Sequence, residues 1–160
     1  MRTKLVPIQV FTDYDIRGPL GKIVMTKGVY DLTHAAHVRS LVTARALGDT
    51  LVVGLATDES VRRVKGPARP ILSFAERVEI LSALTCVDYI VADDAGSTAE
   101  TIRAVRPVQV CASHFEWIGP ADRVELESDG VSFTVISRPP LRSTSDIIDS
   151  IIDSRGSDGE

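Results

Sequence analysis

The sequence lacks several features that would place it in a special class of protein. It has only two cysteines in 160 residues, Cys86 and Cys111, too few for a disulfide framework or a cysteine-rich zinc site. No apolar run approaches the roughly 20 residues of a membrane span, and the N-terminus has no signal-peptide core. We therefore expect a cytoplasmic protein with two free, buried thiols and no membrane partner.

An excess of charge of one sign is also lacking. The 18 basic and 22 acidic residues give a formal net charge of −4, without a basic block. Because general nucleic-acid binding needs a cationic face, nucleic acid is not an expected partner. A phosphate site needs only local donors and a few lysines or arginines, so it stays open. The 44% of hydrophobic residues is typical of a folded domain.

Apolar and amphipathic segments alternate along the chain. Short apolar runs predict buried strands at 22–26, 50–56, 87–91 and 108–111, and an alternating pattern predicts a more exposed edge strand at 131–136. Helices are predicted at 35–47, 58–64, 73–84, 97–105 and 143–152, with Ser73 and Ser143 as N-caps. This order predicts an α/β, Rossmann-like, doubly wound fold, with a mainly parallel five-stranded sheet and helices on both faces.

The same pattern divides the chain into three parts. Residues 1–21 precede the alternation and are expected to form an N-terminal extension, either an arm or an extra strand. Residues 22–153 form the domain, and 154–160 are expected to be a flexible tail. Ligands of such folds lie beyond the carboxyl ends of the strands. The candidate site is therefore built from the loops at 27–37, 57–70, 112–120 and 137–145.

The first of these loops carries two histidines at the start of a helix. Gly28 permits a tight turn, and the helix start near Thr33 offers backbone N–H donors to an anion. His34 and His37 are three residues apart and hence share a face, where both can donate hydrogen bonds to a reacting phosphoryl group. Each could instead be a cap or a surface residue. Zinc-binding pairs usually lie four apart with a further ligand, so no metal site is expected.

Four motifs in sequence order resemble one known family. The segment 27–37 resembles the H-x-G-H signature of the cytidylyltransferase-like nucleotidyltransferases, with Ala36 in place of the motif glycine. Residues 65–70 and 73–77 resemble the phosphate-contacting lysine loop and helix of that family, and 138–145 resembles its late R-T-x-G-I-S-T-T/S motif. The strands near 47–54 and 86–91 are similar too. The family includes glycerol-3-phosphate, choline-phosphate and ethanolamine-phosphate cytidylyltransferases and heptose-1-phosphate adenylyltransferase.

The resemblance implies a nucleotidyltransferase domain at 22–153 and a role for each matching residue. Catalytic roles are implied for His34, His37, Lys65 and Arg138. Nucleotide-binding roles are implied for Thr26, Lys27, Gly28, Val29, Tyr30, Asp31, Ala36, Arg77, Ser143 and Thr144. After the fourth strand the family has an aspartate-containing turn that this chain lacks. In its place His114, Glu116 and Trp117 either shape an acceptor pocket or pack an aromatic ring under the loop, and Arg142 in the late motif is expected to add a charge for an anionic acceptor.

The implied reaction is direct nucleotidyl transfer. A phosphate or phosphonate oxygen of a small acceptor attacks the α-phosphate of a nucleoside triphosphate, and pyrophosphate leaves. Mg²⁺ is expected to arrive with the triphosphate. CTP is the first choice, because Arg138 and residues 143–148 resemble the cytidylyltransferases. ATP with a sugar phosphate is the alternative, because 65–70 and 80–84 resemble the heptose-phosphate enzyme. The departures at Ala36 and after the fourth strand keep a non-catalytic nucleotide-binding or regulatory protein open. A homodimer is expected.

Overall fold

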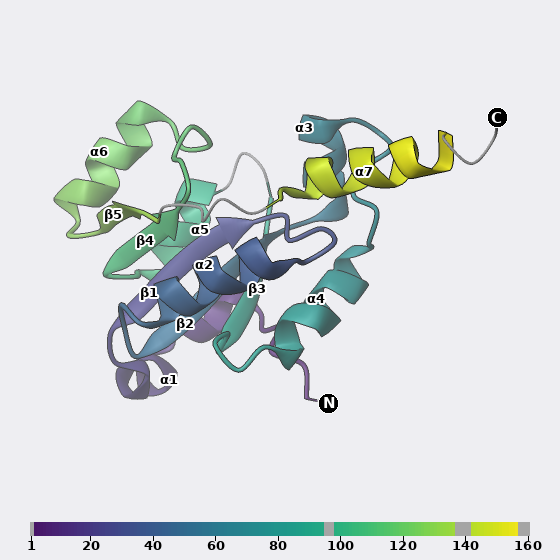
Figure 1. Cartoon of the computed structure of the whole chain (residues 1–160). Coiled ribbons are helices and arrows are strands. Elements are labelled where there is room, and N and C mark those ends of the chain that lie inside the picture. Colours follow the sequence, from purple (N-terminus) through teal and green to yellow (C-terminus); the bar gives the residue numbers. More distant parts are fainter. Residues whose placement is uncertain (1, 95–97, 137–141, 157–160) are drawn as a thin grey trace.

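The computed structural model describes residues 2–94, 98–136 and 142–156. In this part of the chain, five parallel strands form one sheet in the order β3-β2-β1-β4-β5 (Figure 1). The strands are β1 (Ile23–Gly28), β2 (Thr50–Ala56), β3 (Tyr89–Asp93), β4 (Gln109–Ala112) and β5 (Ser132–Val135). The order runs outward from β1 to β3 and then resumes on the other side of β1. This confirms the doubly wound topology, with β5 at an edge as its alternating pattern predicted.

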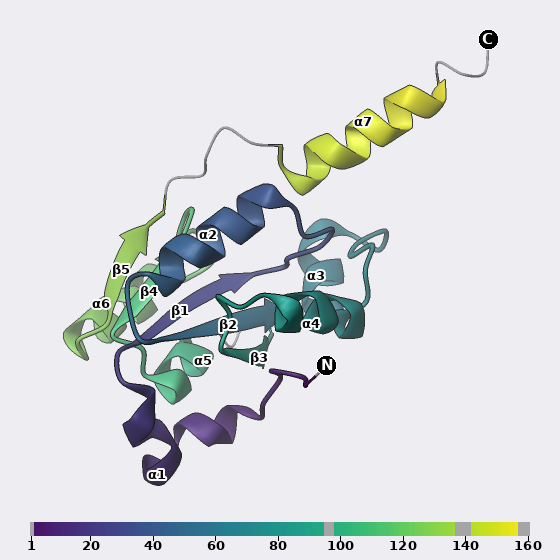
Figure 2. The same ribbon diagram turned by 60° about the horizontal axis from the view of Figure 1, so that its bottom comes forward.

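Helices cover both faces of the sheet. They are η1 (Ile8–Phe11), α1 (Tyr14–Arg17), η2 (Gly18–Leu20), α2 (Ala35–Arg45), α3 (Asp58–Lys65), α4 (Phe74–Ala83), α5 (Thr98–Val105), α6 (Pro120–Ser128) and α7 (Thr144–Gly156). Side chains of α2 and α4 share one core cluster with the sheet, whereas those of η1, α5 and α6 share another. The two layers are visible in Figure 2, with α2 and α5 on opposite sides of the strands.

Alternation along β1 shows how the two cores share one strand. Val24 packs into the cluster with α2 and α4, whereas Ile23 and Met25 pack into the cluster with α5 and α6. All three are at most 1% exposed. Successive side chains of a strand point to opposite faces, so an apolar run without alternation is what a strand covered on both faces requires.

The predicted helix starts at Ser73 and Ser143 are confirmed. Ser73 and Glu76 form a capping box, and Asp146 accepts from the Ser143 backbone N–H while its own N–H donates to the Ser143 hydroxyl. Helix α6 was not predicted. Its signals were Pro120 in the first turn and the buried Leu126.

The first part of the chain packs on the sheet through several short elements. Residues 4–6 lie beside the edge strand β3, where the Val6 N–H donates to Ile90 O and the Ile90 N–H donates to Lys4 O. Phe11 is fully buried in the cluster with α5. The chain thus begins with a short strand-like contact followed by helical turns.

The last helix leaves the body of the domain. In Figures 1 and 2, α7 starts beside α2 and α3 and then projects away from them. It runs to Gly156, so residues 154–156 are helical where a tail was expected. Residues 157–160 lie outside the described part of the chain. Among the described residues no helix is long and apolar enough to cross a membrane.

Candidate active site

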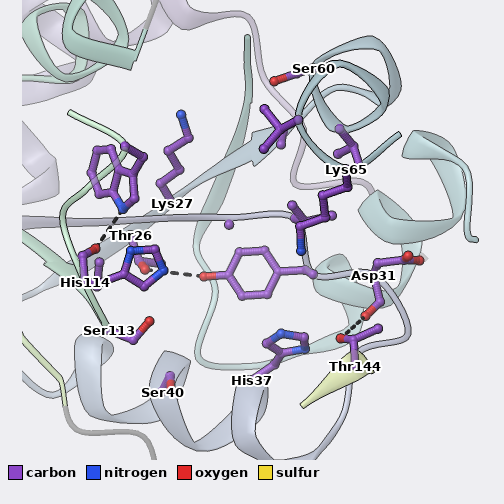
Figure 3. A pocket seen from close by; sticks show the side chains of 18 of the residues that line it. Thr26, Lys27, Asp31, His37, Ser40, Ser60, Lys65, Ser113, His114 and Thr144 are labelled. Carbon is purple, nitrogen blue, oxygen red and sulfur yellow. Dashed lines mark hydrogen bonds between the residues drawn. The ribbon is translucent and has the colours of Figure 1, made fainter. Parts of the chain in front are cut away.

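A pocket of about 470 Å³ opens at the carboxyl ends of β1, β2 and β4. This is the edge that the fold predicts for a ligand, at the point where the strand order changes direction. Of the residues predicted for the site, those that line it are Thr26, Lys27, Gly28, Val29, Tyr30, Asp31, His37, Lys65, His114, Trp117 and Thr144. In Figure 3, Lys65 reaches in from one wall and His37 from the opposite wall.

The loop after β1 holds a strained backbone. Tyr30 and Leu32 have φ angles of 53° and 45°, a left-handed conformation that is uncommon for residues with side chains. Gly28 makes room for it, because a Cβ at that position would lie 2.7 Å from Cε2 of the Tyr30 ring. The Thr33 hydroxyl donates to Tyr30 O at 2.8 Å and closes the turn. The room at Gly28 and the Thr33 hydrogen bond therefore support this conformation of the loop.

Three rings stand together at the start of α2. The rings of His34 and His37 are stacked with centroids 4.0 Å apart, and the Tyr30 ring meets His37 edge-on at 5.3 Å. His37 lines the pocket, while His34 is the N-cap residue beside it. Burial raises the pKa of Tyr30 to about 12, although a hydrogen bond with Thr26 acts in the opposite direction. Tyr30 is therefore neutral near pH 7.

Asp31 is buried and holds the loop that follows α3. Its carboxylate accepts from the backbone N–H groups of Ile71 and Leu72 and pairs with Arg69 at 2.8–2.9 Å. Burial alone would raise the pKa of Asp31, but these N–H groups and Arg69 hold that pKa below its usual value. Because both carboxylate oxygens have protein partners, Asp31 acts here by positioning the loop.

Arg69 brings a guanidinium to the same wall, which sequence reasoning missed. Two of its nitrogens contact Asp31, and its side chain is 15% exposed and lines the pocket. The remaining N–H groups of the fork suit a phosphate. The sequence signal was its position four residues after Lys65, in the segment that matches the lysine loop.

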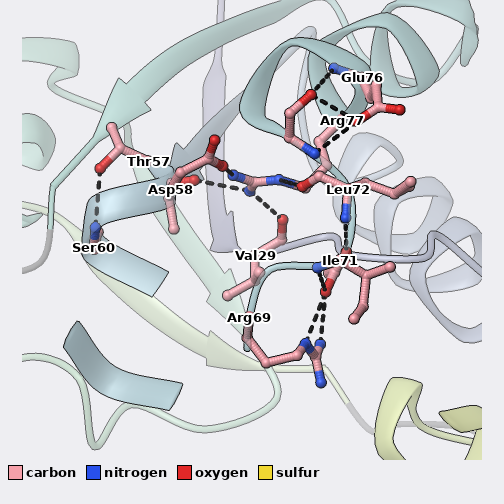
Figure 4. Close-up of polar contacts among 12 residues, drawn as sticks. Val29, Thr57, Asp58, Ser60, Arg69, Ile71, Leu72, Glu76 and Arg77 are labelled. Atoms are coloured by element: carbon pink, nitrogen blue, oxygen red, sulfur yellow. Dashed lines mark hydrogen bonds and ion pairs between the residues drawn. The ribbon is translucent and has the colours of Figure 1, made fainter. Parts of the chain in front are cut away.

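The predicted phosphate contact of Arg77 is wrong for this structure. Its side chain is 0% exposed, and its guanidinium donates to Val29 O, Ala56 O, Leu72 O and Asp58 Oδ1 (Figure 4). An arginine with four protein acceptors has little left to offer a ligand. Arg77 instead ties α4 to the ends of β1 and β2 beneath the pocket.

Helix α7 begins at the rim of the pocket. The Thr144 hydroxyl donates to Asp31 O at 3.1 Å, so the start of α7 is attached to the loop after β1. Ser143 caps the helix and does not line the pocket in the described part of the chain. The N-terminus of α7 thus lies beside the loop that leads into α2.

Lys27 faces the pocket from the end of β1. Its ammonium lies 2.9 Å from Oδ2 of Asp93, donates to the Thr98 hydroxyl and sits over the Trp117 ring. Asp93 is fully buried and also accepts from Thr101 at 2.8 Å. This basic side chain is therefore paired with an acid from β3.

The end of β4 and the loop after it supply the neighbouring wall. Cys111, Ser113, His114 and Trp117 line it, and the indole N–H of Trp117 donates to His114 O at 2.8 Å. This backbone contact fixes the plane of the indole ring. Burial raises the pKa of Cys111 to about 11, so its thiol is protonated near neutral pH. Both cysteines are free thiols, Cys111 buried and Cys86 partly buried.

Two other predicted residues, Ala36 and Arg142, lie elsewhere. Ala36 is 7% exposed and packs inside the domain, so among the described residues its methyl group is not part of the pocket wall. Arg142 is exposed and does not line the described pocket. Arg138 lies outside the described residues. Sequence reasoning also missed several lining residues, because folding alone brings them there: Ser40, Ser60, Val61 and Ser113.

The acidic groups near the pocket are poorly suited to hold a metal ion alone. Asp31 is the one acidic side chain among the described lining residues, and its oxygens already have protein partners. In residues 2–94, 98–136 and 142–156, no three His, Cys, Asp or Glu side chains cluster as a metal site requires. A Mg²⁺ ion bound mainly by phosphate oxygens and water is compatible with these walls.

Comparison with known proteins agrees with this geometry. The sequence matches the Cytidylyltransferase-like family over residues 25–154, and the chain belongs to that family. It is 42% identical over 134 residues to the bifunctional protein HldE of Citrifermentans bemidjiense, covering 83% of this chain and 28% of that protein. The HldE protein of Geobacter metallireducens is 40% identical over 136 residues, 84% of this chain and 28% of its own.

Solved structures share the fold. A lipopolysaccharide core biosynthesis protein from Thermoplasma volcanium superposes with a TM-score of 0.63 at 25% identity, covering 76% of this chain and 99% of that one. A pantoate–β-alanine ligase from Francisella tularensis gives a TM-score of 0.60 at 14% identity, over 90% and 69% of the two chains. The present chain spans little more than a quarter of the HldE proteins, 28% of their length.

Proposed function

We propose that this domain transfers AMP from ATP to the phosphate group of a small sugar phosphate and releases pyrophosphate. The observation that carries the proposal is the convergence of His37, from the first turn of α2, with Lys65, Arg69 and Thr144, the first residue of α7, on one pocket. These groups are all donors or cations, as a site for a triphosphate needs.

The reaction needs no covalent intermediate. An oxygen of the acceptor phosphate attacks the α-phosphorus in line, forming one P–O bond. The bond from the α-phosphorus to the bridging oxygen breaks, and its electron pair leaves with pyrophosphate. Catalysis then consists of holding the two anions in line and stabilising charge on the α-phosphate oxygens.

The side chains have distinct parts in this scheme. His37 donates a hydrogen bond to an α-phosphate oxygen as its charge grows, from a position fixed by the Tyr30 and His34 rings. Lys65, an exposed side chain at the end of α3, bridges phosphates of the two substrates. Arg69, held by Asp31, binds the departing pyrophosphate. Mg²⁺ carried by the triphosphate would neutralise part of its charge.

ATP replaces CTP as the favoured nucleotide. The HldE proteins match 83% of this chain, and residues 65–70 and 80–84 resemble heptose-phosphate adenylyltransferase. The resemblance of Arg138 and residues 143–148 to the cytidylyltransferases covers only a short segment, whereas the match to the HldE proteins runs along most of the chain.

Pyrophosphate release tests the proposal. ATP, CTP, GTP and UTP are each supplied with Mg²⁺ and a panel of sugar 1-phosphates, polyol phosphates and amino-alcohol phosphates. We expect kcat/KM with ATP and a sugar phosphate to exceed that with CTP by about tenfold or more, the discrimination that a few polar base contacts give. A preference for CTP would overturn the choice of nucleotide. Binding of nucleotides by calorimetry without turnover of any pair would overturn the enzyme and favour a regulatory protein.

A further inference from the structure

One wall of the pocket already contains a cation that belongs to the protein. The Lys27 ammonium lies over the Trp117 ring, 5.3 Å from its centroid, which is within the range of a cation–π interaction. The same ammonium lies 2.9 Å from Oδ2 of Asp93. An aromatic face and a carboxylate are the two groups that would attract a cationic ligand to this wall. Lys27 occupies both of them.

We propose that Lys27 selects the acceptor: it excludes phosphate esters of ammonium alcohols and admits those of neutral polyols and sugars. The inference rests on the proposed nucleotidyl transfer and names a specificity-determining residue for its second substrate. An acceptor ammonium placed at this wall would face a like charge where it needed an opposite one. A hydroxyl group meets no such repulsion.

The Lys27 ammonium is held in place by buried partners. Asp93 is 0% exposed, and it also accepts from the hydroxyls of Thr98 and Thr101. If Lys27 turned away, a fully buried carboxylate would lose its counter-ion, which is strongly unfavourable. The ammonium is therefore a fixed part of the wall, and its side chain is 13% exposed.

This wall suits the uncharged part of a substrate better than a triphosphate. The Lys27 ammonium is already paired with Asp93, whereas Lys65 and Arg69 stand elsewhere on the pocket wall as the groups for phosphate. The ammonium also covers one face of the Trp117 ring, so a base cannot stack on that face. Of the three ammonium donors, two serve Asp93 and Thr98 in the described part of the chain. One remains for an acceptor hydroxyl.

The walls beside Lys27 complete a site for hydroxyl groups. Ser113 and His114 line the pocket after β4, and both side chains can donate and accept hydrogen bonds (Figure 3). The indole N–H of Trp117 donates to the His114 backbone oxygen, and this contact fixes the Trp117 ring. A ring or chain of carbons with several hydroxyls fits these alternating donors and acceptors, while a trimethylammonium group would leave them unused.

Binding can be followed directly, because Trp117 is the single tryptophan of the chain. Its fluorescence is measured while glycerol 3-phosphate, mannose 1-phosphate, phosphocholine or ATP is added to the wild-type protein. We expect glycerol 3-phosphate and mannose 1-phosphate to change the emission with saturation, and phosphocholine to cause no change at equal concentration. A change with ATP and none with any acceptor would overturn the proposal by assigning the wall to the nucleotide.

Selectivity is then tested by removing the cation. In Lys27→Met both Asp93 and the Trp117 face become open to a cationic acceptor. The ratio of kcat/KM for glycerol 3-phosphate to that for phosphocholine should fall by about tenfold or more, the size expected when a like charge is removed. Because an unpaired Asp93 can impair folding, the neutral double variant Lys27→Met/Asp93→Asn is measured as well and should also lower the ratio.

Lys22→Met serves as the matched control. Lys22 is an exposed lysine at the opposite end of the same strand, so its loss changes the net charge equally without touching the pocket. We expect its ratio to equal that of the wild type. An unchanged ratio in both Lys27 variants, or wild-type binding of phosphocholine as tight as that of glycerol 3-phosphate, would overturn the role of Lys27. If the wild type turns over no substrate pair, the proposed function fails, while the fluorescence titration still decides which ligand the wall accepts.

Discussion

Two buried carboxylates flank the pocket and make an informative pair. Asp31 is 1% exposed and holds Arg69, whereas Asp93 is 0% exposed and holds Lys27. The two basic side chains are alike in exposure, at 15% and 13%. The two carboxylates differ in their other hydrogen-bond partners. Asp31 also binds two backbone N–H groups of a loop, while Asp93 binds two hydroxyls of α5.

The difference shows that similar ion pairs can serve separate ends of one site. Asp31 organises the chain between Lys65 and α4 and leaves much of the Arg69 fork facing the pocket. Asp93 accepts a hydrogen bond from a hydroxyl of α5 and holds the single ammonium of Lys27. The first pair therefore fits the phosphate end of the pocket, and the second fits the end that selects the acceptor.

The largest expected effect comes from breaking the Asp31 pair. Asp31→Asn leaves Arg69 without its counter-ion and places an amide against two backbone donors. The free energy of unfolding should fall by about 3–5 kcal/mol, as for other broken buried pairs. Urea unfolding measures this. Asp122→Asn, which removes one exposed partner of Arg103, should cost about 1 kcal/mol or less. Equal losses in the two variants would remove the distinction between Asp31 and a surface carboxylate.

The next effect concerns His37, which lines the pocket. His37→Ala should lower kcat by roughly 100- to 1000-fold, the usual cost of a lost transition-state donor. Nucleotide affinity should change far less, because the hydrogen bond strengthens only as charge develops. Steady-state kinetics together with calorimetry separate the two quantities. A loss confined to nucleotide affinity would contradict this role.

A smaller effect should distinguish the two basic side chains. Arg69→Met is expected to raise KM for ATP by about tenfold or more, because a charge-assisted pair of hydrogen bonds to phosphate is lost. Lys27→Met should act mainly on KM for the acceptor. Initial rates with each substrate varied in turn make the comparison. If both variants affect the same substrate, the two ends of the pocket have been assigned wrongly.

The smallest effect is on acid stability. The pKa of Asp31 is lower in the folded protein, so its contribution is fully present above the unfolded-state pKa of about 4. That contribution is lost as the pH falls through the lower, folded-state pKa. Stability measured from pH 7 to pH 3 should therefore decrease more steeply in the wild type than in Asp31→Asn. Parallel curves would show that Asp31 does not titrate as its contacts require.

Much of the fold was predictable because it depends on local patterns. Runs such as 50–56 must be covered on both faces, and Ser73 with Glu76 marks a helix start through contacts three residues apart. The family motifs also located the loops that line the pocket. Helix α6 was missed because its apolar residues are few, and Leu126 is its one fully packed side chain.

Individual roles in the site were harder to predict. Arg77 and Arg69 are both arginines in or next to matching motifs, yet one is buried under the pocket and the other faces it. Nothing local separates them, since the acceptors of Arg77 come from residues 19 to 48 positions away as well as from nearby Leu72. Ala36 likewise has the same sequence position as the motif glycine but packs inward.

The sequence by itself determined the order of the strands and of the helices after β1 except α6, the family and the loops that carry the chemistry, because hydrophobic period, caps and motifs are properties of neighbouring residues. Only the tertiary structure decided which charges face the ligand. Asp93 meets Lys27 across 66 positions, and Asp31 meets Arg69 across 38. A buried carboxylate is costly without a counter-ion, and these carboxylates become buried only when the sheet and its helices pack together.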